Sequence, residues 1–62
     1  MTKKEKIMQI MEIAERHMYD EDDMRVMTKT LKFEDAHAFD NGMIHILCRE
    51  LLGEKIKWRK EI

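Results

Sequence analysis

The stretch from Glu34 to Leu52 constrains the fold most, because it has the pattern of one long and unusually apolar helix. At about 100° per residue, one face gathers the side chains of a core-facing helix. These are Ala36, Phe39, Met43, Ile46, Leu47 and Leu51. The residues that widen this face are Ile44, Cys48 and Leu52, and those on the narrow polar side are Asn41, His45 and Arg49. A helix that is apolar over most of its circumference needs neighbours on two sides.

The ends of this helix are well marked, whereas its middle is ambiguous. Glu34 and Asp35 suit the positive end of the helix dipole, and Gly53 is the expected glycine after the last turn. The sequence Asp40-Asn41-Gly42 is a turn signal on its own, and Gly42 costs about 1 kcal/mol inside a helix. Two alternatives follow: two shorter helices, or one helix over 34–52 in which Gly42 admits a close backbone. The apolar pattern continues across the turn signal and favours one helix.

A second amphipathic helix is predicted near the N-terminus, over about residues 3–19. Thr2 and Glu5 have the spacing of a capping box, in which the two residues satisfy amides at the start of a helix. The apolar side chains that follow fall within a narrow arc. They are Ile7, Ile10, Met11, Ala14 and Met18, with Ile13 and His17 at its edge.

Between these two helices lies a segment whose structure the pattern leaves open. The acidic residues 20–23 oppose continuation of the first helix and suit the start of another, with Asp22 or Asp23 as its N-cap. Met24 and Met27 then recur at helical spacing, which favours a short helix over 22–31. The β-branched residues at positions 26, 28 and 30 also alternate as they would in a strand over 25–32.

The C-terminal tail is basic and alternates in polarity. Its alternating residues are Lys55, Ile56, Lys57, Trp58 and Arg59. They suit a half-buried strand over 55–60 or an extended arm. Pairing of that strand with one over 25–32 gives an α+β fold as the alternative, although two strands alone are marginal. We expect a mainly α domain with two main helices, a short helix or extended segment, and a basic tail.

Length and composition indicate one marginally stable domain. The chain has 62 residues, room for a single domain over 1–62 that buries about 60% of its unfolded surface. One cysteine forms no internal disulfide, and the sequence has neither a run of transmembrane length nor the apolar core of a signal peptide. We expect a cytoplasmic protein without membrane contact. The small core and the wide apolar face predict a homodimer or higher oligomer.

The candidate chemical sites are incomplete sets. Glu34 with His37, and His45 with Cys48, are each one helical turn apart, a spacing found in metal sites. Neither pair supplies a full set of ligands, so we predict no metal ion and no cofactor. Cys48 lies in the apolar helix, where the pKa of a thiol rises and its reactivity falls. The chain has no serine and no glycine-rich phosphate loop, and we expect no enzymatic activity.

Two functions from different classes remain. The preferred one is a small non-enzymatic module for protein–protein interaction or regulation, of a kind common among bacterial and phage regulators. Its expected partner-binding residues are Phe39, Met43, Ile44, Leu47 and Leu51. The alternative is a nucleic-acid-binding dimer that contacts phosphates and stacks an aromatic ring on bases. Its expected residues are Arg49, Lys55, Lys57, Trp58, Arg59 and Lys60. A net charge of −1 favours the first.

Overall fold

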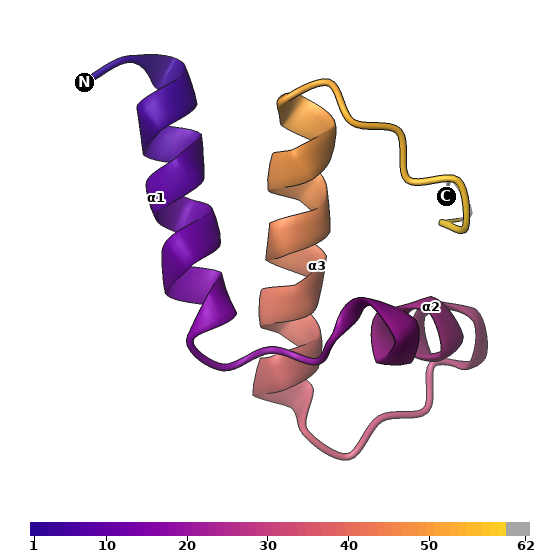
Figure 1. Ribbon diagram of the computed structural model, residues 1–62. Helices are drawn as coiled ribbons and strands as arrows, with labels where there is room; N and C mark the ends of the chain where they lie inside the picture. The colour runs from indigo at the N-terminus through magenta and orange to yellow at the C-terminus, as the bar shows by residue number, and fades with distance from the viewer. Residues whose placement is uncertain (60–62) are drawn as a thin grey trace.

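The helix α3, Ala36–Leu51, is the element on which the other helices pack. The structure is a computed structural model, and it describes residues 1–59. α1 spans Lys3–Glu15 and α2 spans Glu21–Thr30. Figure 1 shows α1 antiparallel beside α3, α2 on the other side of α3, and the C-terminal tail returning toward α2. The long apolar helix therefore has neighbours on two sides, as predicted.

The mainly α fold class is confirmed, and the α+β alternative is wrong. Residues 25–32 belong to α2 and the start of the following loop, and residues 55–59 form irregular and turn structure. Position 60 of the second predicted strand lies outside the described residues. The alternation in the tail has another cause, because Ile56 and Trp58 pack on the core whereas Lys55 and Lys57 are exposed. None of the described helices combines the length and the hydrophobicity that a bilayer crossing requires.

The first two helices begin where a side chain caps the first turn. The Glu5 N–H donates to Thr2 Oγ1 at 3.1 Å, which confirms Thr2 as the N-cap of α1. The Asp23 N–H donates to Asp20 Oδ1 at 2.8 Å, so Asp20 caps α2. The prediction of Asp22 or Asp23 as this cap is wrong. Both lie in the first turn of α2, where the helix dipole favours their negative charge.

α3 starts and ends slightly inside its predicted range of 34–52. Asp35 is its N-cap and accepts a hydrogen bond from the Ala38 N–H at 3.0 Å, so the helix begins at Ala36. Gly53 has a φ of +96°, the left-handed conformation expected of a glycine after the last turn. Gly42 lies within the helix, and the prediction of one unbroken helix is therefore confirmed.

α1 ends at Glu15, earlier than the predicted residue 19, because α3 satisfies the backbone groups that follow. The Tyr19 N–H donates to the Ala38 carbonyl at 3.4 Å. The Asn41 side-chain amide donates to the His17 carbonyl at 2.7 Å. These contacts take the place of the hydrogen bonds of a longer helix. They also hold the end of α1 against the start of α3.

The main core lies between α3, α2 and the tail. Met24, Phe39 and Ile46 are buried in it, and Phe33 stacks on Phe39 with ring centroids 4.1 Å apart. The partly buried side chains around this cluster are Tyr19, Met27, Met43, Ile56 and Trp58. The methionines of α2 and α3 thus serve as core side chains.

Gly42 allows α2 to approach α3 closely. A Cβ atom at position 42 would lie 2.4 Å from Met24 Sδ and 2.8 Å from Met24 Cε. Met24 is only 2% exposed, so a Cβ at position 42 would force a buried side chain out of its present conformation. The close approach predicted at Gly42 therefore exists, although the neighbour is a side chain and not a backbone.

The Gly42→Ala variant tests this contact. Alanine gains about 1 kcal/mol of helix propensity over glycine, whereas overpacking a filled core costs about 1–3 kcal/mol. We expect the steric cost to dominate, so the free energy of unfolding in urea should fall. Asp40→Ala, at an exposed position of the same helix, is the control and should change it by about 0.5 kcal/mol or less. A Gly42→Ala variant more stable than the wild type would contradict the close contact.

Asp35 links α1 to the start of α3. The hydrogen bond from the Ala38 N–H lowers the pKa of the Asp35 carboxyl, and the His17 imidazole, 2.7 Å away, lowers this pKa further. A carboxyl whose pKa is lower in the folded state stabilises the fold above its unfolded pKa of about 4. That contribution is lost as the pH falls through the lower, folded-state pKa.

The Asp35→Asn variant keeps a capping oxygen and removes the ionisation. Its free energy of unfolding should therefore fall less steeply than that of the wild type between about pH 5 and pH 2. Urea unfolding at a series of pH values measures the two slopes, with Asp40→Asn on the same helix as the control. Equal slopes for Asp35→Asn and the wild type would show that Asp35 does not contribute in this way.

Candidate interaction surface

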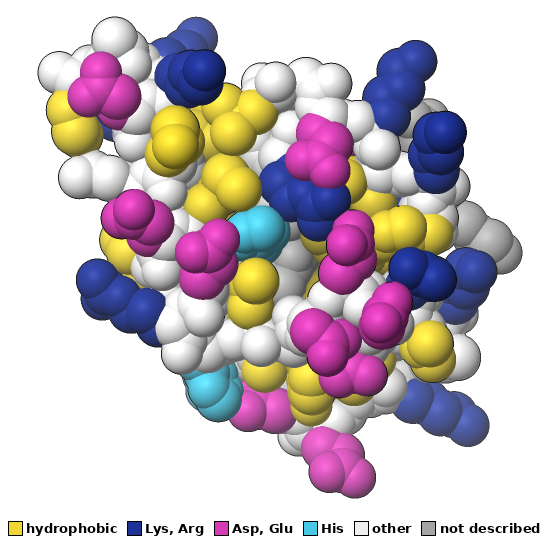
Figure 2. Space-filling model, viewed as in Figure 1, with side chains coloured by type: hydrophobic (Ala, Val, Ile, Leu, Met, Phe, Trp, Pro, Cys, Tyr) yellow, Lys and Arg dark blue, Asp and Glu magenta, His cyan; other side chains and the backbone are white. Residues whose placement is uncertain are grey.

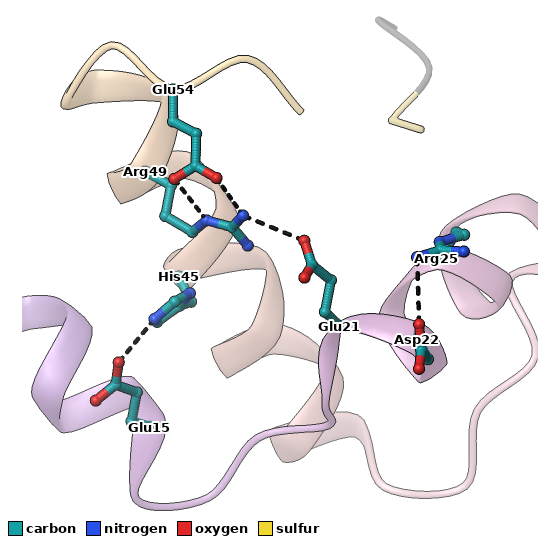
Figure 3. A network of polar contacts seen from close by, with 7 residues as sticks. All are labelled: Glu15, Glu21, Asp22, Arg25, His45, Arg49 and Glu54. Carbon is teal, nitrogen blue, oxygen red and sulfur yellow. Dashed lines mark hydrogen bonds and ion pairs between the residues drawn. The ribbon is translucent and has the colours of Figure 1, made fainter. Parts of the chain in front are cut away.

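One side of the α1–α3 pair carries several neighbouring polar contacts, drawn in Figure 3. His45 Nε2 lies 2.9 Å from Glu15 Oε1, which joins α3 to α1. About one turn further along α3, the Arg49 guanidinium donates to Glu21 Oε1 at 3.1 Å, which joins α3 to α2. The side chains of His45 and Arg49 are only 14% and 18% exposed. Figure 2 shows acidic, basic and histidine side chains gathered on this side of the molecule.

Arg49 also holds the C-terminal tail in place. Its Nε donates to Glu54 Oε2 at 3.0 Å, and its Nη2 donates to the other oxygen of the same carboxylate. This two-bond contact raises the pKa of Arg49 and lowers the pKa of Glu54. Further along the tail, Arg59 lies 2.7 Å from Glu50 Oε1 and forms a second ion pair with α3. The described part of the tail is therefore attached to α3 both near its start and at Arg59.

These ion pairs involve some of the residues predicted for nucleic-acid binding and leave others exposed. Arg49 and Arg59 are paired with carboxylates of the same chain, and Trp58 packs on the core. Lys55 and Lys57 are exposed. Lys60 lies outside the described residues. Two of the predicted phosphate contacts thus already have partners, and the nucleic-acid alternative stays a prediction.

The opposite side of the α1–α3 pair is aliphatic. At about 100° per residue, Leu47 lies roughly 160° around α3 from His45, and Ile13 lies roughly 160° around α1 from Glu15. The same geometry places three further exposed residues at least about 100° from the polar contacts. We call the five the aliphatic face: Ile10, Ile13, Ile44, Leu47 and Leu51, which are 40% to 73% exposed.

The predicted partner-binding residues divide between this face and the core. Ile44, Leu47 and Leu51 belong to the aliphatic face. Phe39 is buried, and Met43 is half-buried against the same cluster. Ile10 and Ile13 were missing from the prediction. The narrow apolar arc on α1 gave no signal for them, because an arc of that width is expected to face the core.

The groups considered for metal binding or catalysis lie apart. Residues 1–59 contain no cluster of three histidine, cysteine or acidic side chains that could hold a metal ion. His45 contacts Glu15, and burial raises the pKa of the Cys48 thiol. A cavity of about 190 Å³ lies near Arg49 and Trp58, below the roughly 300–1,000 Å³ of typical small-molecule pockets. Two larger hollows, of about 550 and 580 Å³, are more open and lie along the tail and beside the end of α2. The aliphatic face is the more prominent feature.

Comparison with protein-family models, with curated proteins and with solved structures finds no match to this chain.

The Arg49→Gln variant tests whether Arg49 fixes the tail. Loss of both contacts to Glu54 should release the tail, and Trp58 should move from the core into water. Trp58 is the only tryptophan, so its fluorescence emission should shift to the red while the helical circular dichroism persists. The control is Arg25→Gln, because the Arg25 pair with Asp22 is local to α2 and exposed. Unchanged emission in Arg49→Gln, or an equal shift in the control, would contradict this role.

Proposed function

We propose that this chain is a non-enzymatic protein–protein interaction module of the cytoplasm that works as a homo-oligomer. In this proposal, the module binds another protein chain through the aliphatic face. The observation that carries the proposal is the exposure of five aliphatic side chains on one side of the α1–α3 pair. Single exposed hydrophobic residues are normal on any protein, whereas a contiguous patch is typical of an interaction site.

The position of the polar contacts supports this proposal. Glu15–His45 and Arg49–Glu21 fix α1 and α2 against α3 from the side away from the aliphatic face. A binding face that is already ordered loses less conformational entropy on association than a mobile one. α1 and α3 therefore present the side chains of the aliphatic face in a fixed arrangement.

The chemistry of the remaining groups is consistent with a binding role. Cys48 is buried, and its raised pKa disfavours the reactive thiolate. A single cysteine without an internal disulfide is compatible with a reducing compartment. The partner in this proposal is a protein chain, because the face offers aliphatic contact area and few hydrogen-bonding groups.

Site-specific photo-crosslinking tests the proposal. A benzophenone amino acid replaces Leu47 on the aliphatic face or, as a control, Val26 on α2, which is 58% exposed. Illumination in the cells that make the protein should attach a protein chain at position 47 and none at position 26. Capture at neither position, or equal capture at both, would contradict binding through the aliphatic face.

A further inference from the structure

The chain exposes more surface than a folded monomer of its mass. A monomer of 7.6 kDa is expected to expose about 4,300 Å², whereas this chain exposes 5034 Å². The excess of roughly 700 Å² approaches the area of about 800 Å² that each partner contributes to a standard protein interface. One interface of ordinary size would therefore remove the excess.

The dimensions of the molecule agree with this result. The Cα radius of gyration is 11.7 Å, against about 10.6 Å for a compact domain of this length. The three principal extents are 37, 23 and 17 Å, so the molecule is elongated and is thinnest along one axis. A thin layer of helices suits an arrangement in which a second layer covers one of its faces.

The core is small for a chain that must fold alone. The buried hydrophobic residues of the described chain are Ala14, Met24, Ala38, Phe39, Ile46 and Cys48. Chains below roughly 70–80 residues usually gain stability from disulfides, metal ions or oligomerisation. One cysteine makes an internal disulfide impossible. Association through the aliphatic face would bury further apolar area on α1, which lies outside the main core, and on the side of α3 that faces away from that core.

We infer that a second copy of this chain covers the aliphatic face, so that α1 and α3 of two copies form a four-helix bundle with two-fold symmetry. This inference rests on the proposed function and names the partner. An antiparallel helix pair with one apolar side is half of such a bundle. In a two-fold interface both copies use the same patch, so each residue of the aliphatic face becomes buried in both copies.

The edge of the aliphatic face is compatible with contact between identical copies. A face that meets itself must avoid a single sign of charge, because like charges would repel across the interface. Lys6 lies about one turn before Ile10 on α1, and Asp40 lies about one turn before Ile44 on α3, so in this antiparallel pair the two charges lie at opposite ends of the face. The edge therefore carries both signs. Apolar centres with polar edges are the usual composition of protein interfaces.

The end of the face near the tail offers space for a side chain of the second copy. A shallow groove of about 410 Å³ there is lined by Leu47, Glu50, Leu51 and Arg59. Glu50 and Arg59 are paired with one another, so the two charges on this groove compensate. An aliphatic side chain of the second copy suits the chemistry of this groove.

Analytical ultracentrifugation of the whole chain tests the inference. The wild type should sediment at twice the mass of the 7.6 kDa monomer, and its thermal midpoint should rise with protein concentration. Leu47→Glu places one charge from each copy in the interface and should raise the dissociation constant by roughly a hundredfold or more. Val26→Glu, on α2, is the matched control and should leave the dimer intact.

The outcomes separate this inference from the proposed function. A helical wild-type monomer at high micromolar concentration would overturn the inference, as would equal weakening by Leu47→Glu and Val26→Glu. If crosslinking at position 47 then captured a different protein, binding of a protein through the aliphatic face would stand, whereas the homo-oligomer and the choice of partner would fail. If Leu47→Glu fails to fold, the concentration dependence of the wild-type thermal midpoint still shows whether the chain forms a dimer. A midpoint that does not depend on concentration would exclude the dimer.

Discussion

α3 has more apolar surface than any one neighbour covers, and the arrangement of the chain follows from this constraint. α1 packs on one side of it, and α2 with the tail packs on another. The approach of α2 depends on Gly42, because only a residue without a Cβ leaves room for Met24. Two neighbours still leave Ile44, Leu47 and Leu51 exposed. The helix that organises the core is thus also the main source of the exposed aliphatic side chains.

The polar contacts determine which side of the molecule stays aliphatic. His45 and Arg49 lie about one turn apart on α3 and reach Glu15, Glu21 and Glu54 on three other segments. Charged hydrogen bonds of this kind are stronger than neutral ones when they are partly shielded from water. They orient α1, α2 and the tail, and the apolar arcs of α1 and α3 that face away from them have no partner within the described chain.

The sequence predicts the helices well because their signals are local. The cap at Thr2, the glycine at Gly53 and the continuous apolar pattern across Gly42 all act within a few residues. The errors arise where contacts with residues far away in the sequence determine the local structure. α1 stops early because α3 satisfies the backbone of His17 and Tyr19. The alternation of the tail resembled a strand, although its apolar residues pack on the core individually.

The candidate surface was predictable only in part, for a similar reason. Ile44, Leu47 and Leu51 follow from the width of the apolar arc on α3, but a helical wheel does not show which part of a wide arc the neighbours leave open. The pairing of Arg49 with Glu54, and of Arg59 with Glu50, depends on the path of the tail. The basic residues of the tail therefore looked available for a ligand in the sequence, whereas two are already paired in the fold.

An isotope-filtered NMR experiment tests most directly whether two copies meet through the aliphatic face. A sample that mixes labelled and unlabelled chains reports only contacts between different copies. We expect intermolecular contacts among the methyl groups of Ile10, Ile13, Ile44, Leu47 and Leu51. Intermolecular contacts confined to other methyl groups, such as those of Val26 on α2, or no such contacts in a folded sample, would contradict this expectation.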